Sequence, residues 1–179
     1  MNREPAMRPW IGAIVVGAII SWAPADSASL SVSSRISATG VGAIMFGVTP
    51  AQARATGEKF DNTAPVRGST CFYMRPRALP GLAFLVEGGT IRRAEVSKAT
   101  IGTTDDIRIG DSASKVLKLY GGRAHSSTDK YDPHARVIIV DNKSASDAKR
   151  KMVFKVNAGK VRSIYAGLVP QINYVEGCA

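Results

Sequence analysis

FLVEGGTIRRAEV, residues 84–96, is the stretch that decides the fold, because it returns in altered form as FKVNAGKVRSIYA at residues 154–166. Both segments fit the pattern F-x-V-x-x-G-x-(I/V)-R, at an offset of 70 residues. Each predicts a β-hairpin: an apolar strand, a turn at Gly89 or Gly159 where a positive φ is easily adopted, and a second strand. The phenylalanine that opens each segment is expected to face the core. The sequence therefore predicts a supersecondary unit that occurs twice.

A helix start precedes each hairpin. TPAQ at residues 49–52 has the layout of a capping box with proline at the first helical position, so Thr49 is expected to cap a short helix. GDS at residues 110–112 matches GVT at residues 47–49, and Ser112 is expected to cap a second helix. The inner face of that helix would carry four apolar residues at helical spacing: Ala113, Val116, Leu117 and Tyr120.

These patterns predict an α+β fold. It would consist of two tandem repeats, each a short helix packed on a small antiparallel sheet that ends in a β-hairpin. The first repeat is predicted at residues 36–97 and the second at residues 98–179, packed together as one domain. Residues 123–134 are polar and are predicted to form a loop within the second repeat.

The N-terminus has the features of an export signal. Two arginines precede an uncharged, largely apolar run at residues 10–22, and small residues follow at 23–25. This layout predicts a secretory signal peptide at residues 1–25. The alternative is a transmembrane anchor, which needs about 20 apolar residues. Residues 26–35 are rich in serine and are predicted to form a flexible lead-in, and no cysteine directly follows the apolar run, so no lipid anchor is expected.

The cysteines and the charge limit what the exported part can be. The chain has 179 residues and a formal net charge of +10, and about 150 residues without the signal peptide are enough for one domain with a hydrophobic core. Cys71 and Cys178 both lie in this part, so a disulfide is expected in a periplasmic or secreted protein, with two free thiols as the alternative. Neither cysteine has a second potential ligand at the spacing typical of zinc sites, so a zinc site at these cysteines is not expected.

A family resemblance is carried by the helix starts at residues 47–53 and 110–116. They resemble the Gly-x-Thr/Ser helix start of a repeat found in tandem in the β-lactamase inhibitory protein and singly in the small lipoprotein of the outer-membrane barrel assembly machine. The resemblance spans most of residues 36–166. It implies a helix packed on a small antiparallel sheet and a non-catalytic binding role. No contact residue of those proteins matches a position here, so it implies no target.

Two groups of residues are candidates for a chemical site. SASK at residues 112–115 fits the S-x-x-K pattern, in which a lysine could activate a serine, but Thr49 occupies the same slot in the first unit without the lysine. Ser112 is therefore interpreted as a helix cap. A small serine hydrolase ranks third, behind the two candidate functions given below. The only histidines, His125 and His134, lie among polar residues whose spacing matches no metal-ligand pattern, so no metal and no cofactor are expected. These neighbours are Asp129, Tyr131 and Asp132.

Positive charge is concentrated within the second hairpin. A basic stripe there could attract polyanions such as lipopolysaccharide, anionic lipid, wall polymer or extracellular DNA, or it could only keep the surface soluble. The leading prediction is an exported, non-catalytic binding protein of the cell envelope that uses its sheet surface to hold an unidentified protein or envelope component. Polyanion binding is the alternative. The basic residues are Lys149, Arg150, Lys151, Lys155 and Lys160.

Overall fold

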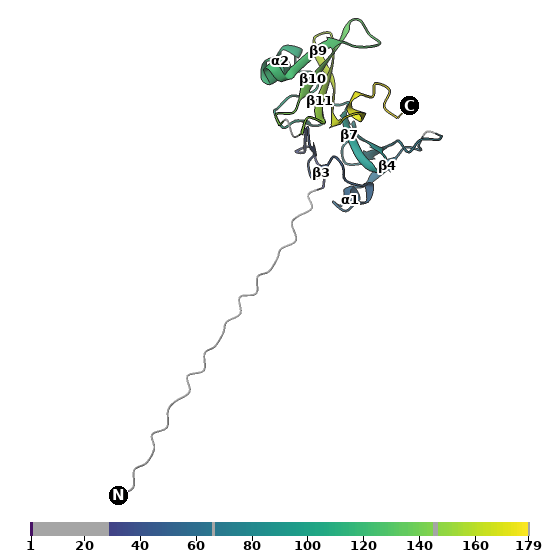
Figure 1. Ribbon diagram of the computed structural model, residues 1–179, viewed down its shortest axis with the longest axis vertical. Helices are drawn as coiled ribbons and strands as arrows, with labels where there is room; N and C mark the ends of the chain where they lie inside the picture. Colours follow the sequence, from purple (N-terminus) through teal and green to yellow (C-terminus); the bar gives the residue numbers. More distant parts are fainter. Residues whose placement is uncertain (2–28, 66, 145–146, 179) are drawn as a thin grey trace.

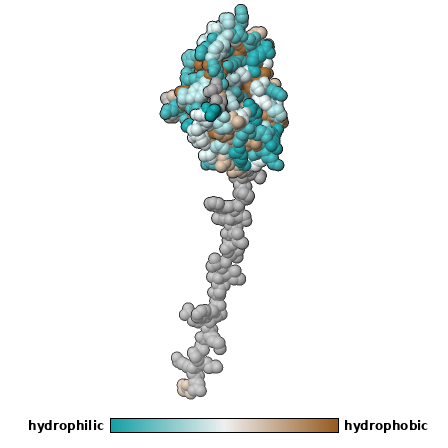
Figure 2. Space-filling view, turned by 90° about the vertical axis from the view of Figure 1, so that its right-hand side faces the viewer, coloured by the Kyte–Doolittle hydropathy of each residue, from teal (hydrophilic) through white to brown (hydrophobic). Residues whose placement is uncertain are grey.

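The computed structural model describes residue 1 and residues 29–65, 67–144 and 147–178 (Figure 1). The predicted signal peptide, apart from its first residue, and the first part of the predicted lead-in lie outside the described residues. The rest of the lead-in contains Leu30, which is buried, and ends at Arg35, where the first strand begins. On the face that Figure 2 presents, apolar residues form small separate areas among hydrophilic ones.

An eight-stranded sheet dominates the structure. Its strand order is β4-β5-β6-β7-β12-β11-β10-β9, and every neighbouring pair is antiparallel. The central pair, β7 with β12, joins the two halves of the chain. The strands are β4 (Phe60–Asn62), β5 (Phe72–Pro76), β6 (Leu82–Glu87), β7 (Thr90–Val96), β9 (Ala124–Thr128), β10 (Ala135–Asp141), β11 (Arg150–Asn157) and β12 (Lys160–Leu168).

A smaller sheet and short helices cover one face of the large sheet. The smaller sheet has the order β3-β2-β1-β8, in which β8 runs parallel to β1. Its strands are β1 (Arg35–Ser37), β2 (Gly40–Val41), β3 (Ile44–Met45) and β8 (Gly102–Thr103). The helices on this face are α1 (Pro50–Arg54) and α2 (Ala113–Tyr120), followed by the 3₁₀ turn η1 (Gly121–Arg123). A further 3₁₀ turn, η3 (Gln171–Asn173), lies against the opposite face.

The predicted fold class is wrong. The chain is mostly β, and the hairpin strands do not close two small sheets but join into one sheet of eight strands. Separate sheets would leave the backbone groups along one edge of β7 and of β12 unpaired, and the β7–β12 ladder removes both edges. Helix α1 has only five residues, and a four-stranded second sheet was not expected. Part of the predicted loop at residues 123–134 is strand β9.

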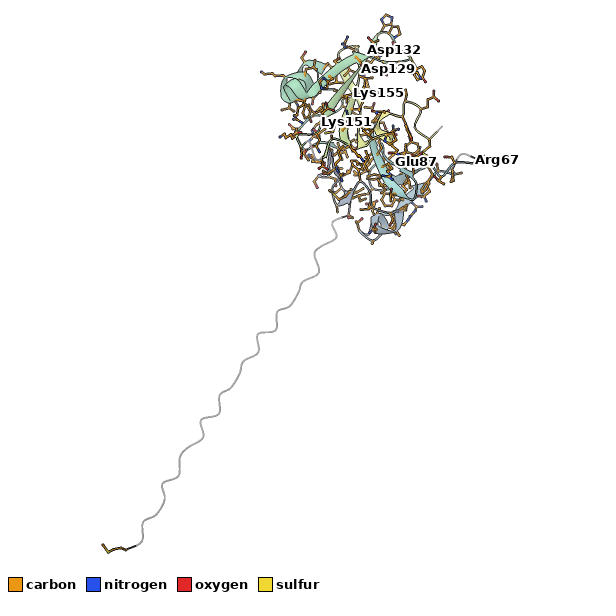
Figure 3. The ribbon with its side chains drawn as sticks, in the orientation of Figure 1. Arg67, Glu87, Asp129, Asp132, Lys151 and Lys155 are labelled. Carbon is orange, nitrogen blue, oxygen red and sulfur yellow. A yellow bond between two sulfur atoms is a disulfide. The ribbon has the colours of Figure 1, made fainter. Side chains whose placement is uncertain are left out.

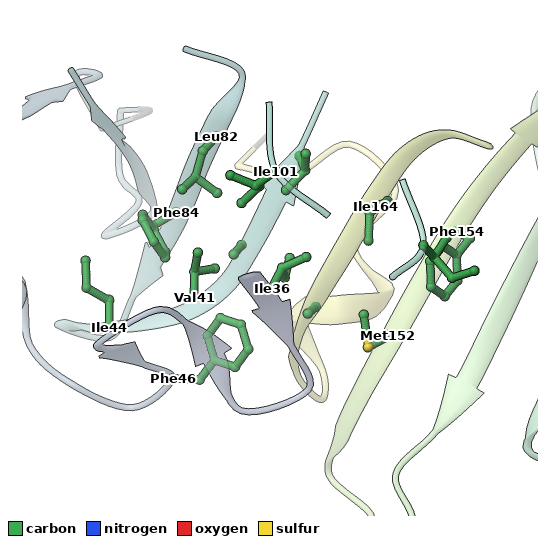
Figure 4. Packing of buried hydrophobic residues seen from close by; sticks show 14 of the residues in the cluster. Ile36, Val41, Ile44, Phe46, Leu82, Phe84, Ile101, Met152, Phe154 and Ile164 are labelled. Atoms are coloured by element: carbon green, nitrogen blue, oxygen red, sulfur yellow. The ribbon is translucent and has the colours of Figure 1, made fainter. Parts of the chain in front are cut away.

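The hydrophobic core lies between the large sheet, the small sheet and α2. Figure 4 shows part of it, with side chains packed between strands. Phe84 and Phe154 are both fully buried there, on the face of the sheet that the sequence pattern predicts for them. The ring of Tyr120 in α2 lies 5.7 Å from that of Phe154. Leu117, expected on the inner face of α2, is instead 38% exposed, because Val116 and Tyr120 are the residues that point inward.

The sequence pattern that occurs twice corresponds to the same local structure in both halves of the chain. Gly89 and Gly159 take φ values of 75° and 70° in two-residue hairpin turns, which require this left-handed geometry. Thr49 and Ser112 cap α1 and α2 by accepting backbone N–H groups three residues later. Beside each cap the backbone pairs with the hairpin, at Ile91 in the first half and at Val161 in the second.

Replacing Phe154 with alanine should lower the free energy of unfolding by about 3–5 kcal/mol, because a fully buried ring leaves a cavity. Lys155→Ala, one residue along and on the opposite face, should change it by no more than about 0.5 kcal/mol. Denaturant unfolding of both variants measures the difference. Equal destabilisation would show that the two faces of β11 are assigned wrongly.

Candidate functional site

The last residues of the chain lie across the face of the large sheet that points away from the core, here called the outer face. This C-terminal segment, residues 169–178, includes η3 and passes beside β7 (Figure 1). Gln171 and Ile172 are buried against the sheet. The segment is tied to the residue that precedes β5 by the disulfide Cys71–Cys178, with 5.4 Å between the Cα atoms, as the sequence predicts.

Arg93 is the main anchor of the C-terminal segment. Its side chain is 2% exposed, and it rises from the outer face of β7. The Nη1 group donates to the carbonyl oxygens of Gln171 (2.8 Å) and Tyr174 (2.7 Å), while Nε donates to Glu95 (3.0 Å). The guanidinium also lies 5.1 Å from the ring centre of Tyr165. The buried charge is thus met by one carboxylate, two carbonyl groups and an aromatic face.

A tyrosine and a second acidic side chain complete this anchor. Tyr73 donates its hydroxyl to Glu95 (2.7 Å), and burial together with Glu95 raises the pKa of Tyr73 to about 12, so the hydroxyl remains a donor at neutral pH. Glu87 accepts from Gln171 Nε2 (2.6 Å) and from the Tyr174 hydroxyl (3.2 Å). Glu87 of β6 therefore holds two side chains of the segment whose backbone carbonyl groups Arg93 binds.

A groove lies between the C-terminal segment and the second half of the sheet. We call it the outer groove; its volume is about 410 Å³. Its floor is formed by the outward side chains of β10, β11 and β12, and its wall by residues 172–175. The rim is polar and includes the end of β9. The floor residues are Val137, Ile139, Val153 and Tyr165, and the rim residues are Ser127, Thr128, Asp129, Lys130 and Lys155.

The rim combines one close pair of opposite charges with exposed apolar groups. Lys155 Nζ lies 4.0 Å from Asp129 Oδ2 and 5.6 Å from the ring centre of Tyr165, and Figure 3 shows the two charged residues together at one end of β11. Nearby, Tyr131 is 58% exposed and Val175 is 40% exposed. The groove thus offers apolar contact area with a few polar groups at its edge, the composition typical of ligand pockets.

The predicted basic cluster does not form one patch. Lys151 pairs with Asp141 (2.8 Å), and this hydrogen bond lowers the pKa of Asp141. Arg150 pairs with Asp147 (3.3 Å) instead. Two lysines remain exposed but lie apart, one before β11 and one at the start of β12. They are Lys149 and Lys160.

The serine and histidine candidates have structural partners. Lys115 donates its backbone N–H to Ser112 Oγ (3.1 Å), but its ammonium bonds Asp111 (3.0 Å) rather than the serine. His125 lies on β9 and contacts Asp141 (3.2 Å), while the backbone N–H of His134 donates to the side chain of Asp132. Within the described residues no group of three or more His, Cys, Asp or Glu side chains is arranged to hold a metal ion.

The sequence interpretation missed Arg93 and the outer groove. Arg93 is buried, although an arginine in a β-hairpin is ordinarily expected at the exposed surface. A usable signal was VIIV at residues 137–140, which is apolar at every position and so indicates a strand covered on both faces.

Comparisons with known proteins inform the fold alone. No family model and no curated protein matches the sequence. Among solved structures, the chain is similar to the uncharacterized protein YfeY from Escherichia coli, with a TM-score of 0.50 and 14% sequence identity over 74% of this chain and 99% of that one. In the part of the chain that the structure describes, no helix is long and apolar enough to span a membrane.

Arg93→Ala should lower the free energy of unfolding of the oxidised protein by about 3 kcal/mol, because Glu95 and two buried carbonyl groups lose their partner. The matched control is Arg75→Ala, which removes an exposed arginine near Tyr73 and should cost no more than about 0.5 kcal/mol. Denaturant titration measures both values. A small loss at Arg93, similar to that of the control, would rule out its role as the anchor.

Proposed function

We propose that this chain is an exported, non-catalytic binding protein of the cell envelope, and that the outer groove is where it holds a protein or another envelope component. The observation that carries the proposal is the outer groove itself, because its wall is a separate segment fixed by a disulfide and by buried Arg93. Because its wall is anchored, the groove stays open and its apolar floor remains accessible to a ligand. Such a preorganised surface loses less conformational entropy when it binds.

The disulfide agrees with an oxidising, non-cytoplasmic compartment, where such bonds persist. Together with the signal-peptide pattern at residues 1–25, it supports the periplasm or the extracellular space as the place of action.

The two other candidate functions have less support. Polyanion binding would need free cations in one stripe, but Lys151 and Arg150 are each paired with an aspartate. A serine hydrolase would need a base at Ser112, and the ammonium of Lys115 is directed to Asp111. Both therefore rank below binding in the outer groove.

A pull-down from an envelope fraction tests the proposal. The bait is the mature, oxidised protein, and Ile139→Glu places a charge in the apolar floor of the groove. This variant should lose the captured component, about tenfold or more in recovery, since an unpaired charge in an apolar contact is strongly unfavourable. Recovery should fall only moderately as salt rises, because the apolar contact in the groove survives screening, whereas binding of a polyanion would be lost.

The matched control is Leu119→Glu, which makes the same kind of change at a 47% exposed leucine on α2, outside the groove. It should retain the captured component. Equal recovery with both variants, when both are folded by circular dichroism, would contradict the proposal.

A further inference from the structure

The strand at the rim of the outer groove is an open edge of the sheet. β9 stands last in the strand order, and four of its five residues are exposed. Its sequence, AHSST, contains no proline and no lysine, and its pairing with β10 has no bulge, so the usual devices that protect an edge are missing. The opposite edge, β4, is only three residues long and has Arg54 bound to its Asn62.

The hydrogen-bond register shows which backbone groups of β9 are open. Asp129 donates its N–H to the carbonyl of Ala135, in line with the β9–β10 register. Because antiparallel ladders alternate, the backbone of Ser127 also points toward β10. The N–H and C=O groups of Ser126 and Thr128 then point away from the sheet, where an added strand would bind them.

An added strand would also bring side chains to the outer groove. A residue placed opposite Ser127 would point to the outer face, since cross-strand neighbours share a face. Ser127 is small, and its neighbour across the ladder is Val137 in the groove floor. A large apolar side chain on the added strand could therefore extend over Ser127 and contact Val137 and Ile139.

Charges around β9 favour an acidic partner. Lys130 lies 4.9 Å from the ring centre of Tyr131 and is attracted by Glu176, which accepts from the Tyr131 hydroxyl. Arg136 donates to the hydroxyl of Ser126, and neither cation forms an ion pair within 4 Å among the described residues. Three other carboxylates near β9 already have partners. Asp129 accepts from the Tyr131 N–H and pairs with Lys155, and Asp132 accepts from the His134 N–H and from Asn157. Asp141 pairs with His125 and Lys151. The positive charge of Arg136 therefore lies beside the open edge without an ion-pair partner among the described residues.

We infer that the outer groove and the edge of β9 together bind an extended segment of a partner protein, which adds to the sheet as a ninth strand. The segment carries a large apolar side chain that enters the groove and acidic side chains beside Lys130 and Arg136. The backbone groups of Ser126 and Thr128 supply affinity, and the groove supplies specificity, as in other cases of strand addition. This inference rests on the proposed function and names the partner chemistry of the same site.

The test uses the mature oxidised protein and a labelled peptide, Glu-Val-Glu-Leu-Glu-Val-Glu with blocked ends. Fluorescence polarisation should show binding that is about tenfold tighter than for the peptide with lysine in place of each glutamate. On binding, amide hydrogen exchange should slow at Ser126 and Thr128, whose N–H groups point outward, and should stay unchanged at Ser127. Absence of binding at millimolar peptide, or protection that leaves Ser126 and Thr128 unaffected, would overturn the inference.

A pair of variants isolates the backbone contact. Thr128→Pro removes the outward N–H at an edge position that tolerates proline, and should weaken peptide binding about tenfold, the effect of one lost hydrogen bond. Thr128→Ala keeps that N–H and should bind as the wild type does. If both variants bind equally, strand addition is wrong. If Thr128→Pro still captures the envelope component while Ile139→Glu does not, the proposed function stands and this inference fails.

Discussion

The buried guanidinium of Arg93 is the interaction on which the outer half of the structure depends. A buried cation is tolerated only when its donors and its charge are met, and here Glu95 and two carbonyl groups of the C-terminal segment meet them. Those carbonyls belong to the same segment that walls the outer groove. The requirement to satisfy one arginine therefore also fixes the shape of the candidate binding surface, and the Cys71–Cys178 disulfide secures the segment beyond it.

Local features of the fold could be predicted from the sequence, whereas the sheet could not. Turn glycines, helix caps and the inward faces of Phe84 and Phe154 follow from short-range patterns. The β7–β12 pairing joins strands about 70 residues apart in the chain, and no periodicity indicates which strand edges meet. β9 has no apolar alternation that would mark it as a strand, so a polar loop was predicted in its place.

Some features of the candidate site could likewise be predicted from the sequence, and others could not. The disulfide could be predicted because two cysteines that follow a predicted signal peptide have few other fates. The ion pair of Lys151 could not be predicted, because its partner Asp141 lies on a neighbouring strand that the pattern alone does not place beside it. The outer groove was missed because it requires the C-terminal segment to return over the sheet, a long-range event that depends on Arg93.

Site-specific photo-crosslinking in intact cells tests the central claim, that a partner occupies the outer groove, most directly. A photoreactive amino acid at Val175, an exposed position on the wall of the groove, should give a discrete covalent adduct with an envelope component. The same amino acid at Leu119 on α2 should give none. An adduct from Leu119 with none from Val175 would place the binding surface on the other side of the molecule and contradict the account.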